Sequence, residues 1–398
     1  MKWSFVNLAD VLRSAEVFVD GDWVESKDQD VNGDVRLIQL ADIGDGYYID
    51  KSSRFLTSEK ARELRCTFLE KGDVLVARMP DPLGRACIFP GDSKRSVTVV
   101  DICIIRPNPE DHDARWLMHC LNAPVCRNQM ADFATGTTRT RISRGNLAKI
   151  KIPVPPLEEQ KRIAEVLDRA QSLISKRREA IAELDTLIQA IFIEMFGDPV
   201  VNPKGWDSYT LQEITIKITD GEHLNPDFSS DGMPIIMAGN VLENYVDFQN
   251  AKKVDVLLGK RFRKKCNPEK GDILLVSRGA TIGRLCAVDF PDECCLMGSV
   301  ILIKLDNLTV ESRYLKSLLK HSSMYAKLFN TSGSSAQQAI YLKDLKRLIC
   351  IIPPLNIQQE FAHRVEALER LKAAHRASLS ELDALFASLQ HRAFRGEL

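Results

Sequence analysis

The sequence predicts an α+β protein with two mixed α/β domains in a tandem pseudo-repeat, joined by two long antiparallel coiled-coil helices. The first observation behind this prediction is self-similarity, because the motifs of the first half of the 398-residue chain return in the same order about 198 residues later. The second is that each half contains both strand-like and helix-like hydrophobic spacing. The third is a pair of long heptad-patterned segments at 155–188 and 353–386.

The repeat is clearest at turns and core positions. The segment "KGDVLVARMPDPLGRACIF" (71–89) matches "KGDILLVSRGATIGRLCAV" (270–288), and "VDGDWVES" matches "TDGEHLNP". The first of these matches aligns two glycine–arginine steps, Gly84–Arg85 and Gly283–Arg284. Between such positions the similarity is poor, which is typical of one fold used twice for two different targets.

Strands are expected early in each half and helices later. Short β-branched runs bounded by Gly or Pro, such as "GDVLVAR", "SVTVVDICIIRP", "GDILLVSR" and "MGSVILIKL", predict strands. Residues 112–130 and 312–329 have helical spacing instead. The predicted parts are a first mixed domain at 1–157, a central helix at 158–197, a second mixed domain at 198–355 and a C-terminal helix at 356–398.

The two long helices carry apolar residues at alternating spacings of three and four, with polar breaks at Arg177, Lys372 and His375. The predicted interface residues of the helix pair and its partners are Ile163, Leu167, Ile174, Ile181, Leu184 and Ile188, then Phe361, Val365, Leu368, Leu379, Leu382 and Phe386. Residues 158–196 would extend about 58 Å at roughly 1.5 Å per residue. Their matching places predict that the helices pack on each other, and the wide apolar stripes favour a further partner.

Composition excludes some classes of protein. The 54 Lys and Arg residues balance the 54 Asp and Glu residues, which argues against a simple DNA-coating protein. Basic stretches at 135–153 and 251–270 could bind a phosphate backbone, although such stretches are commonly solvated faces. No apolar run is long enough for a bilayer and the start lacks a signal-peptide pattern, so a cytoplasmic protein without membrane association is expected.

Motifs for catalysis and metal binding are weak. The ten cysteines form no CxxC pair, and no metal site is expected, because the nearest grouping, His112, Asp113, His119 and Cys120, is a poor one. Neither a phosphate-binding loop nor a methyl-donor motif occurs, so no catalytic residue is predicted. Asp81, Asp92 and Lys94 loosely fit the PD…(D/E)xK spacing of metal-dependent nucleases, but the second half keeps the fold without that triplet.

The run "TGTTRTRIS…LAKIKIPVPPLEEQKRIAEVLD", its second copy ending in "AFRGEL", the "DGEHLNP" segment and the duplicated layout resemble the specificity (S) subunit of type I restriction-modification systems. The resemblance implies two target-recognition domains, each reading one half of an asymmetric bipartite site in double-stranded DNA. It implies that the helices set the spacer and dock two modification (methyltransferase) subunits, through which restriction (motor and nuclease) subunits join. The chain itself would be non-catalytic and hold no cofactor, with AdoMet, ATP and Mg²⁺ on the partner subunits.

Cations in loops are the predicted DNA contacts. They are Arg78, Arg85, Arg139, Arg141 and Arg144 in the first half, and His223, Lys264, Lys265, Arg278 and Arg284 in the second. Arg85 and Arg284 are the strongest candidates because they recur beside matched glycines, although each could serve only phosphates or the turn itself. Gln337 and Gln338 stand where the first half has Arg139 and Arg141, which fits either a change of base readout or a polar hinge.

Two alternatives remain. A stand-alone DNA-binding regulator would use the same two domains without enzyme partners, but the wide apolar stripes of the helices argue against it. A nuclease built on Asp81, Asp92 and Lys94 is the alternative from a different class.

Overall fold

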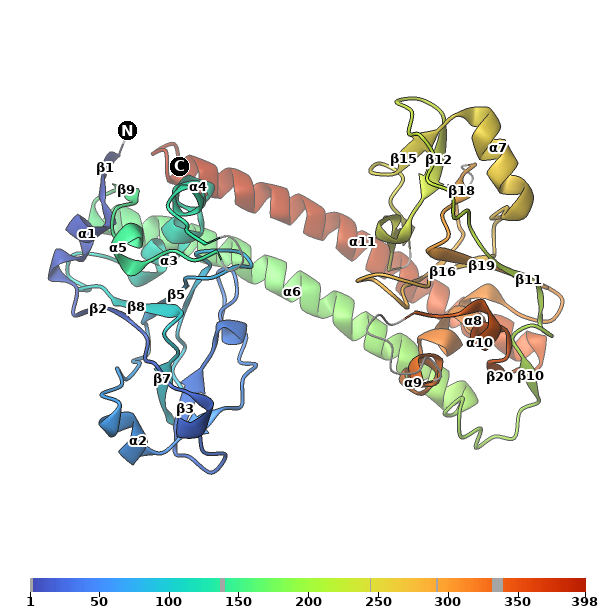
Figure 1. Cartoon of the computed structure of the whole chain (residues 1–398), viewed down its shortest axis with the longest axis horizontal. Helices are drawn as coiled ribbons and strands as arrows, with labels where there is room; N and C mark the ends of the chain where they lie inside the picture. The colour runs from blue at the N-terminus through green and yellow to red at the C-terminus, as the bar shows by residue number, and fades with distance from the viewer. Residues whose placement is uncertain (1–2, 137–139, 244, 291–292, 331–338) are drawn as a thin grey trace. The chain divides into compact units, whose positions relative to one another are not determined.

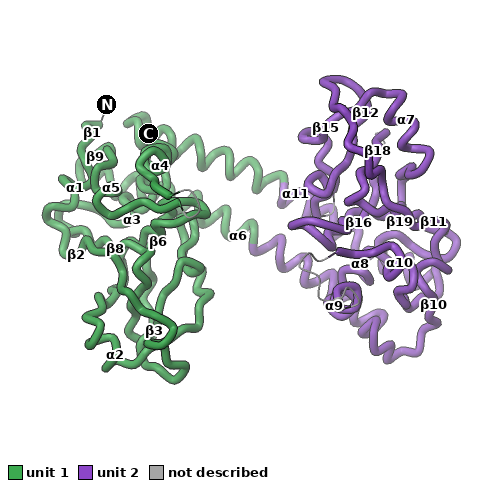
Figure 2. Tube along the Cα trace, viewed as in Figure 1, with its two compact units in different colours: residues 1–178, 377–398 green, residues 179–376 purple. Residues whose placement is uncertain are grey.

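The computed structural model describes residues 3–136, 140–243, 245–290, 293–330 and 339–398. The chain forms two compact units (Figure 2), the first made of residues 1–178 and 377–398 and the second of residues 179–376. Each unit therefore combines one mixed domain with half of each long helix, whereas the sequence-based boundaries separate domain from helix. Among the described helices, none has the length and apolar character needed to cross a membrane.

The first unit is built on three sheets (Figure 1). A four-stranded sheet has the order β2-β8-β5-β6, a three-stranded sheet the order β4-β3-β7, and β1 pairs with β9. Their bounds are β1 Ser4–Asn7, β2 Val17–Asp20, β3 Val35–Ile38, β4 Phe55–Leu56, β5 Val74–Ala77, β6 Ala86–Ile88, β7 Arg95–Thr98, β8 Ile102–Arg106 and β9 Lys151–Val154. Strands β5 and β8 are buried along almost their whole length, as the continuous apolar runs predict.

Short helices complete the first unit: α1 Leu8–Val11, α2 Ser58–Glu63, α3 Ala114–Asn122, α4 Pro124–Asp132 and α5 Arg144–Leu147. Helix α3 covers the four-stranded sheet and buries Trp116, Leu117 and Leu121 in the largest core of this unit. The three-stranded sheet and α2 enclose a separate small core around Leu37 and Val97. We call this outer part, which consists of the three-stranded sheet with α2, the distal lobe of the first unit.

The second unit repeats the topology of the first. Its sheets have the orders β11-β19-β16-β17 and β15-β12-β18, with the pairs β10-β20 and β13-β14 beside them. The strands are β10 Ser208–Thr210, β11 Thr215–Asp220, β12 Met233–Ile236, β13 Val241–Leu242, β14 Tyr245–Val246, β15 Lys252–Val254, β16 Ile273–Val276, β17 Leu285–Ala287, β18 Cys295–Leu296, β19 Val300–Leu305 and β20 Ile349–Ile351. The helices are α7 Val256–Lys265, α8 Ser312–Lys320, α9 Ser322–Asn330 and α10 Leu342–Lys346.

The two predicted long helices are present as α6 (Leu157–Phe196) and α11 (Leu355–Ala393). In the first unit the beginning of α6 shares a core with the end of α11, through Ile163, Leu167 and Ala393. In the second unit the end of α6 shares a core with the beginning of α11, through Phe192 and Phe361, whose rings are 5.7 Å apart. Each unit thus shows the antiparallel direction that the sequence predicts.

All twelve predicted interface residues of the helices are buried or partly buried. Several of these residues also pack into the core of the adjoining mixed domain, as Leu167 does in the first unit and Val365 in the second. The wide apolar stripe is therefore explained in part by each helix packing on its own domain. Lys372, a polar break in the heptads, is only 2% exposed and pairs with Asp185 of α6.

Two glutamines anchor the mixed domains to the long helices in the same way. In the first unit Gln160 accepts a hydrogen bond from the Asp113 backbone N–H (3.0 Å) and donates to the Pro155 carbonyl (2.9 Å). In the second unit Gln358 accepts from the Glu311 N–H (2.9 Å) and donates to the Pro353 carbonyl (2.8 Å). Both side chains are buried, and each satisfies backbone groups that would otherwise lack partners.

The matched tryptophans at the start of each half bind the ends of the long helices. Trp3 donates its indole N–H to the carbonyl of Ala393, the last residue of α11, at 3.0 Å. Trp206 donates to the carbonyl of Phe196, the last residue of α6, at 3.1 Å. Both contacts satisfy a carbonyl that has no partner within its own helix. The chain therefore uses one local solution at both helix ends.

Candidate nucleic-acid interface

A tight turn after β2 recurs after β11. The N–H of Gly21 donates to the Ile102 carbonyl (2.7 Å), and that of Gly221 donates to the Val300 carbonyl (3.0 Å). A Cβ at Gly21 would lie 2.3 Å from the Val99 oxygen, and a Cβ at Gly221 would lie 2.2 Å from the Leu296 oxygen. Only glycine fits so close to another backbone. The turn is thus fixed in both units, and the residues after it can vary.

Trp23 and His223 occupy the matched position after this turn. Trp23 is 68% exposed, with its indole N–H donating to Glu25 at 3.2 Å. His223 is exposed as well, and its Nε2 lies within hydrogen-bond distance of the Asp220 carboxylate, at 2.7 Å. His223 is among the predicted DNA contacts, whereas Trp23, the exposed residue at the matched position, is not. Its alignment with His223 was the sequence signal that could have found it.

Arg85 does not lie on the surface. It is 8% exposed, and its guanidinium donates to four backbone carbonyls, those of Ile43 (2.7 Å), Leu40 (2.9 Å), Pro82 (3.2 Å) and Met79 (3.3 Å). Burial lowers the pKa of this guanidinium from its usual value. The expectation of an open loop cation at Arg85 is corrected, because these carbonyls occupy its donors and tie the β5–β6 turn to residues 40–43.

Arg284, the matched residue in the second unit, is exposed. Within the described residues its side chain has no hydrogen-bond or ion-pair partner. The turns themselves are alike, since Gly84 and Gly283 both have positive φ angles of 77° and 83°. The same two-residue motif therefore holds a structural arginine in one unit and an accessible one in the other.

Arg78 is likewise internal. It is buried, donates to the Val100 carbonyl and pairs with Asp20 at 3.3 Å. At the matched position of the second unit, Ser277 donates to the Ser299 carbonyl at 3.1 Å. The expectation of an open cation at Arg78 is corrected for the same reason as at Arg85. Arg278 is exposed, with its backbone bridged to Ala339.

The remaining predicted cations of the first unit differ in accessibility. Arg141 is partly exposed and pairs with Asp101 at 3.3 Å. Arg144, also partly exposed, donates to the Phe18 carbonyl at 3.0 Å. Arg139 lies outside the described residues, as do Gln337 and Gln338.

The predicted lysines of α7 have separate roles. Lys265 is partly exposed and holds the tight turn of its unit, because its ammonium lies 3.2 Å from the Asp220 carboxylate and 2.9 Å from the Gly221 carbonyl. Lys264 is exposed. Of the cations predicted as DNA contacts in the second unit, Lys264, Arg278 and Arg284 are therefore exposed, and exposed His223 lies beside the turn.

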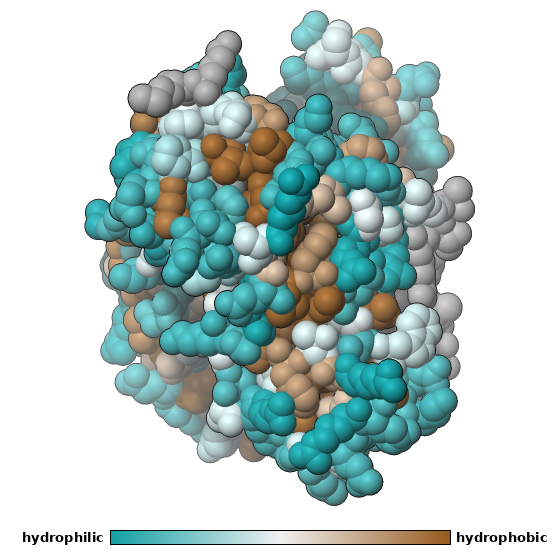
Figure 3. Space-filling view, turned by 90° about the vertical axis from the view of Figure 1, so that its left-hand side faces the viewer, coloured by the Kyte–Doolittle hydropathy of each residue, from teal (hydrophilic) through white to brown (hydrophobic). Residues whose placement is uncertain are grey.

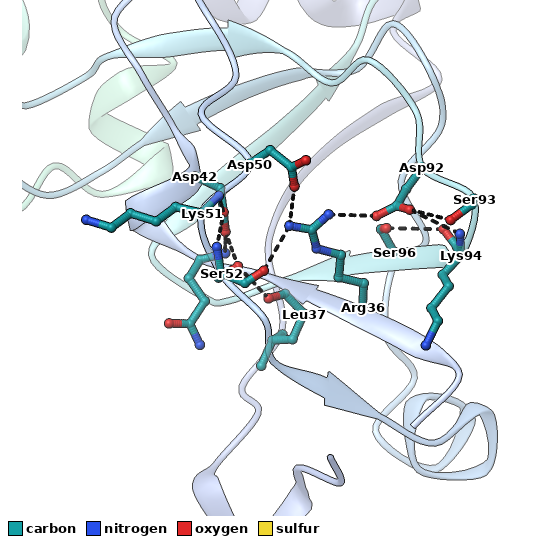
Figure 4. Close-up of polar contacts among 11 residues, drawn as sticks. Arg36, Leu37, Asp42, Asp50, Lys51, Ser52, Asp92, Ser93, Lys94 and Ser96 are labelled. Carbon is teal, nitrogen blue, oxygen red and sulfur yellow. Dashed lines mark hydrogen bonds and ion pairs between the residues drawn. The ribbon is translucent and has the colours of Figure 1, made fainter. Parts of the chain in front are cut away.

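The nuclease-like triplet gains no support from the structure (Figure 4). Asp92 forms an ion pair with Arg36 at 3.0 Å. Lys94 donates to the Gly33 carbonyl at 3.2 Å. Burial raises the pKa of Asp92, but hydrogen bonds from the Lys94 N–H and from Arg36 outweigh it and hold that pKa below the usual range. Over the described residues, no three His, Cys, Asp or Glu side chains are arranged to hold a metal ion.

The other grouping of possible metal ligands is occupied by structural contacts. Asp113 caps α3 by accepting from the backbone N–H groups of Arg115 (2.9 Å) and Trp116 (3.0 Å). His119 pairs with Asp168 of α6 at 2.7 Å, and the sulfur of Cys120 lies 3.8 Å from that of Cys126. These side chains stabilise the packing of α3.

The two units share one topology and carry different side chains at the same turns, which defines a tandem repeat of two similar α+β units. The chain belongs to the family described as "Type I restriction modification DNA specificity domain", which matches residues 1–184 and 203–384. The resemblance stated from the sequence is thereby confirmed.

Among its relatives, the EcoKI specificity subunit of Escherichia coli (strain K12) is 23% identical over 314 residues, which cover 71% of this chain and 65% of the relative. The chain thus spans just under two thirds of that relative. The putative MjaX specificity subunit of Methanocaldococcus jannaschii is 24% identical, with 78% of this chain and 75% of the relative covered. The crystal structure of a type I S subunit from M. genitalium shares the fold, with a TM-score of 0.54 and 14% identity over 99% of this chain and 96% of that one.

Proposed function

We propose that this chain reads a bipartite DNA sequence as the specificity subunit of a type I restriction-modification complex, with each mixed domain reading one half-site. The observation that carries the proposal is a pair of matched turns, at which the side chains of the two units differ in type or in exposure. Trp23 and His223 follow one turn, and buried Arg85 and exposed Arg284 follow the other. Base identity is read by side chains at fixed positions, so different side chains on one fold imply two different half-sites.

The chemistry falls to partner subunits in this proposal. The chain contributes no catalytic residue, and AdoMet, ATP and Mg²⁺ act on the modification and restriction subunits. Support comes from the family and from the internal contacts of Asp92 and Lys94. A stand-alone regulator is not favoured, because its family relatives are named as subunits of restriction enzymes.

Two modification subunits dock on the long helices in this proposal. Leucines remain exposed on them at positions that repeat with the period of the chain: Leu173 on α6 recurs as Leu371 on α11, and Leu187 recurs as Leu385. The face of the molecule in Figure 3 is mostly hydrophilic, with apolar residues gathered in patches. Exposed leucines repeated in this way favour two similar partner surfaces, one for each copy of the repeat.

Sequencing of DNA methylation in cells with and without this chain tests the proposal. The modification subunit is present in both cultures. With the chain, we expect methylation at a motif of two different half-sites separated by a spacer of fixed length. Methylation that is the same in both cultures, while the methyltransferase is active, would contradict the proposal.

A further inference from the structure

Helix α7 of the second unit has a strongly basic surface. Its ten residues include five cations and no acid. Two cations have acidic partners, because Arg263 pairs with Glu293 at 3.7 Å and Lys265 with Asp220 at 3.2 Å. Lys260, Arg261 and Lys264 are exposed, and within the described part of the chain their side chains have no ion-pair partner.

These three cations share one side of the helix. Phe262 and Gly259 are buried and form the inner side, where Phe262 packs in a core with Met233 and Val254. Lys260 and Lys264 are four residues apart and Arg261 and Lys264 three, so their side chains lie together on the outer side. We call Lys260, Arg261 and Lys264 the α7 cation face. Among the residues that the structure describes, no carboxylate forms an ion pair with these three side chains.

The helix is tied rigidly to the tight turn that precedes His223. The Lys265 ammonium contacts both Asp220 and the Gly221 carbonyl, and the Lys217 ammonium donates to the Lys265 carbonyl at 2.6 Å. The α7 cation face therefore keeps a fixed position relative to this turn. A ligand that contacts the turn meets the cations of α7 at a constant place.

The helix at the corresponding place in the first unit, α2, has no such face among its described residues. This distal-lobe helix carries Glu59 and Glu63 beside Lys60 and Arg62, and Lys60 pairs with Glu63 at 2.6 Å. Cations near the C-terminal end of a helix interact favourably with the helix dipole, and this effect alone would explain one or two of the cations in α7. Three exposed cations on one side, without acids between them, exceed that need. The difference between the units points to a ligand of the second unit.

We propose that the α7 cation face binds the phosphate backbone of double-stranded DNA, so that the second mixed domain supplies a sequence-independent anchor that the first lacks. Phosphates on duplex DNA are regularly spaced anions, and exposed Lys and Arg side chains neutralise them without reading bases. The inference rests on the proposed DNA-reading function and adds a division of labour between the two units.

Salt dependence of DNA binding tests it. The full chain is co-purified with its modification subunit and added to fluorescent DNA duplexes at several salt concentrations. One duplex has a random sequence, and the other carries the motif identified by methylation sequencing. The test variant combines Lys260→Gln, Arg261→Gln and Lys264→Gln. We expect the slope of log affinity against log salt to fall by about 0.9 for each phosphate contact removed, or about 2.7 for all three. Affinity should fall by the same factor on both duplexes, and the methylated motif should not change.

A matched control removes three exposed cations of the first unit, with Lys51→Gln, Arg62→Gln and Lys71→Gln. The control should leave the slope unchanged. An equal fall in both variants would overturn the proposal, since net charge alone would then explain the effect. An unchanged slope with lost co-purification of the modification subunit would also overturn it, because α7 would then bind a protein. If even the wild-type complex does not prefer the motif duplex, the proposed function fails instead.

Discussion

Arg85 and Arg284 show the same glycine–arginine motif in two different surroundings. Both follow a glycine with positive φ at the same turn of the same sheet, yet Arg85 is buried on four carbonyls and Arg284 is exposed. A smaller residue replaces part of the Arg85 contacts in the second unit, because Thr281 donates to the Ala238 carbonyl at 3.3 Å. Ala238 lies 198 residues after Leu40, at the period of the repeat, and Leu40 is one of the residues whose carbonyl Arg85 contacts. Recurrence in the sequence therefore identifies the turn, and the surroundings decide what its arginine does.

The largest effect is expected from Arg85→Ala. The change leaves buried carbonyls without donors and removes hydrogen bonds to a charged group, so we expect the free energy of unfolding to fall by on the order of 4 kcal/mol. Thermal or urea unfolding measures it. Thr281→Ala is the matched control in the second unit, with an expected loss of about 1 kcal/mol. Equal losses for both variants would contradict the structural role of Arg85.

Asp185→Ala should have the next largest effect. Lys372 is buried and pairs with the Asp185 carboxylate. Removal of the carboxylate leaves the buried ammonium without this partner, so we expect the free energy of unfolding to fall by about 3 kcal/mol. Lys372→Ile should cost clearly less, because the first unit has buried Ile174 at the matched place and Asp185 would remain partly exposed. Urea unfolding of both variants provides the comparison. A greater loss for Lys372→Ile would contradict this account of the pair.

Asp42→Asn tests a second difference between the units. Asp42 is buried and accepts hydrogen bonds from the N–H groups of Gln39, Lys51 and Ser52, each at 2.7 Å, and from the Ser52 hydroxyl (Figure 4). An amide N–H₂ there would face a donor, with an expected loss of about 2 kcal/mol. Asn240 lies 198 residues after Asp42, at the period of the repeat. Its side chain accepts a hydrogen bond from the Met237 N–H and donates one to the Asp247 carbonyl, so Asn240→Ala is a control that removes both a donor and an acceptor. An Asp42→Asn variant as stable as the wild type would contradict the role of the carboxylate.

The pH dependence of stability should follow from the same carboxylate. Burial raises the pKa of Asp42, but its hydrogen bonds outweigh burial and hold that pKa below the ordinary value of 3.8. The unfolded chain therefore binds this proton first, so Asp42 stabilises the fold above about pH 4 and loses that effect as pH falls through the lower folded pKa. Wild-type stability should fall more steeply below about pH 4 than that of Asp42→Asn. Parallel curves from urea unfolding across this range would contradict the assignment.

Arg284→Ala should have the smallest effect on stability. Its side chain is exposed, so the unfolding midpoint should stay within error of the wild type. If Arg284 reads a base, the variant should relax one motif position by about 1 to 3 kcal/mol; if it contacts a phosphate, all sequences should weaken alike. Binding to a set of single-base variants of the motif distinguishes the two. An unchanged affinity for every duplex in the set would exclude a DNA contact at Arg284.

The long helices, the repeat and the mixed domains could be predicted because local hydrophobic spacing determines them. Their apolar seam, from Ile163 to Ile188, needs no knowledge of distant residues. The burial of Lys372 could not be predicted, because its partner Asp185 is 187 positions away in the sequence. The heptad pattern marks it only as a polar break.

The candidate site was less predictable for a related reason. Whether Arg85 or Arg284 is accessible depends on carbonyls about 45 residues earlier in the chain, which no local motif records. Trp23 falls outside the predicted contacts because those are loop cations, whereas Trp23 is an exposed aromatic residue. The alignment of Trp23 with His223 carried that information.

In the proposed function, each mixed domain reads one half-site independently. The most direct test replaces residues 198–355 with the matching segment of another type I specificity subunit, followed by sequencing of DNA methylation in cells that express the chimera. We predict that one half-site changes while the other half-site and the spacer stay as in the wild type. A chimera with active methyltransferase that changes both half-sites, or neither, would contradict the claim.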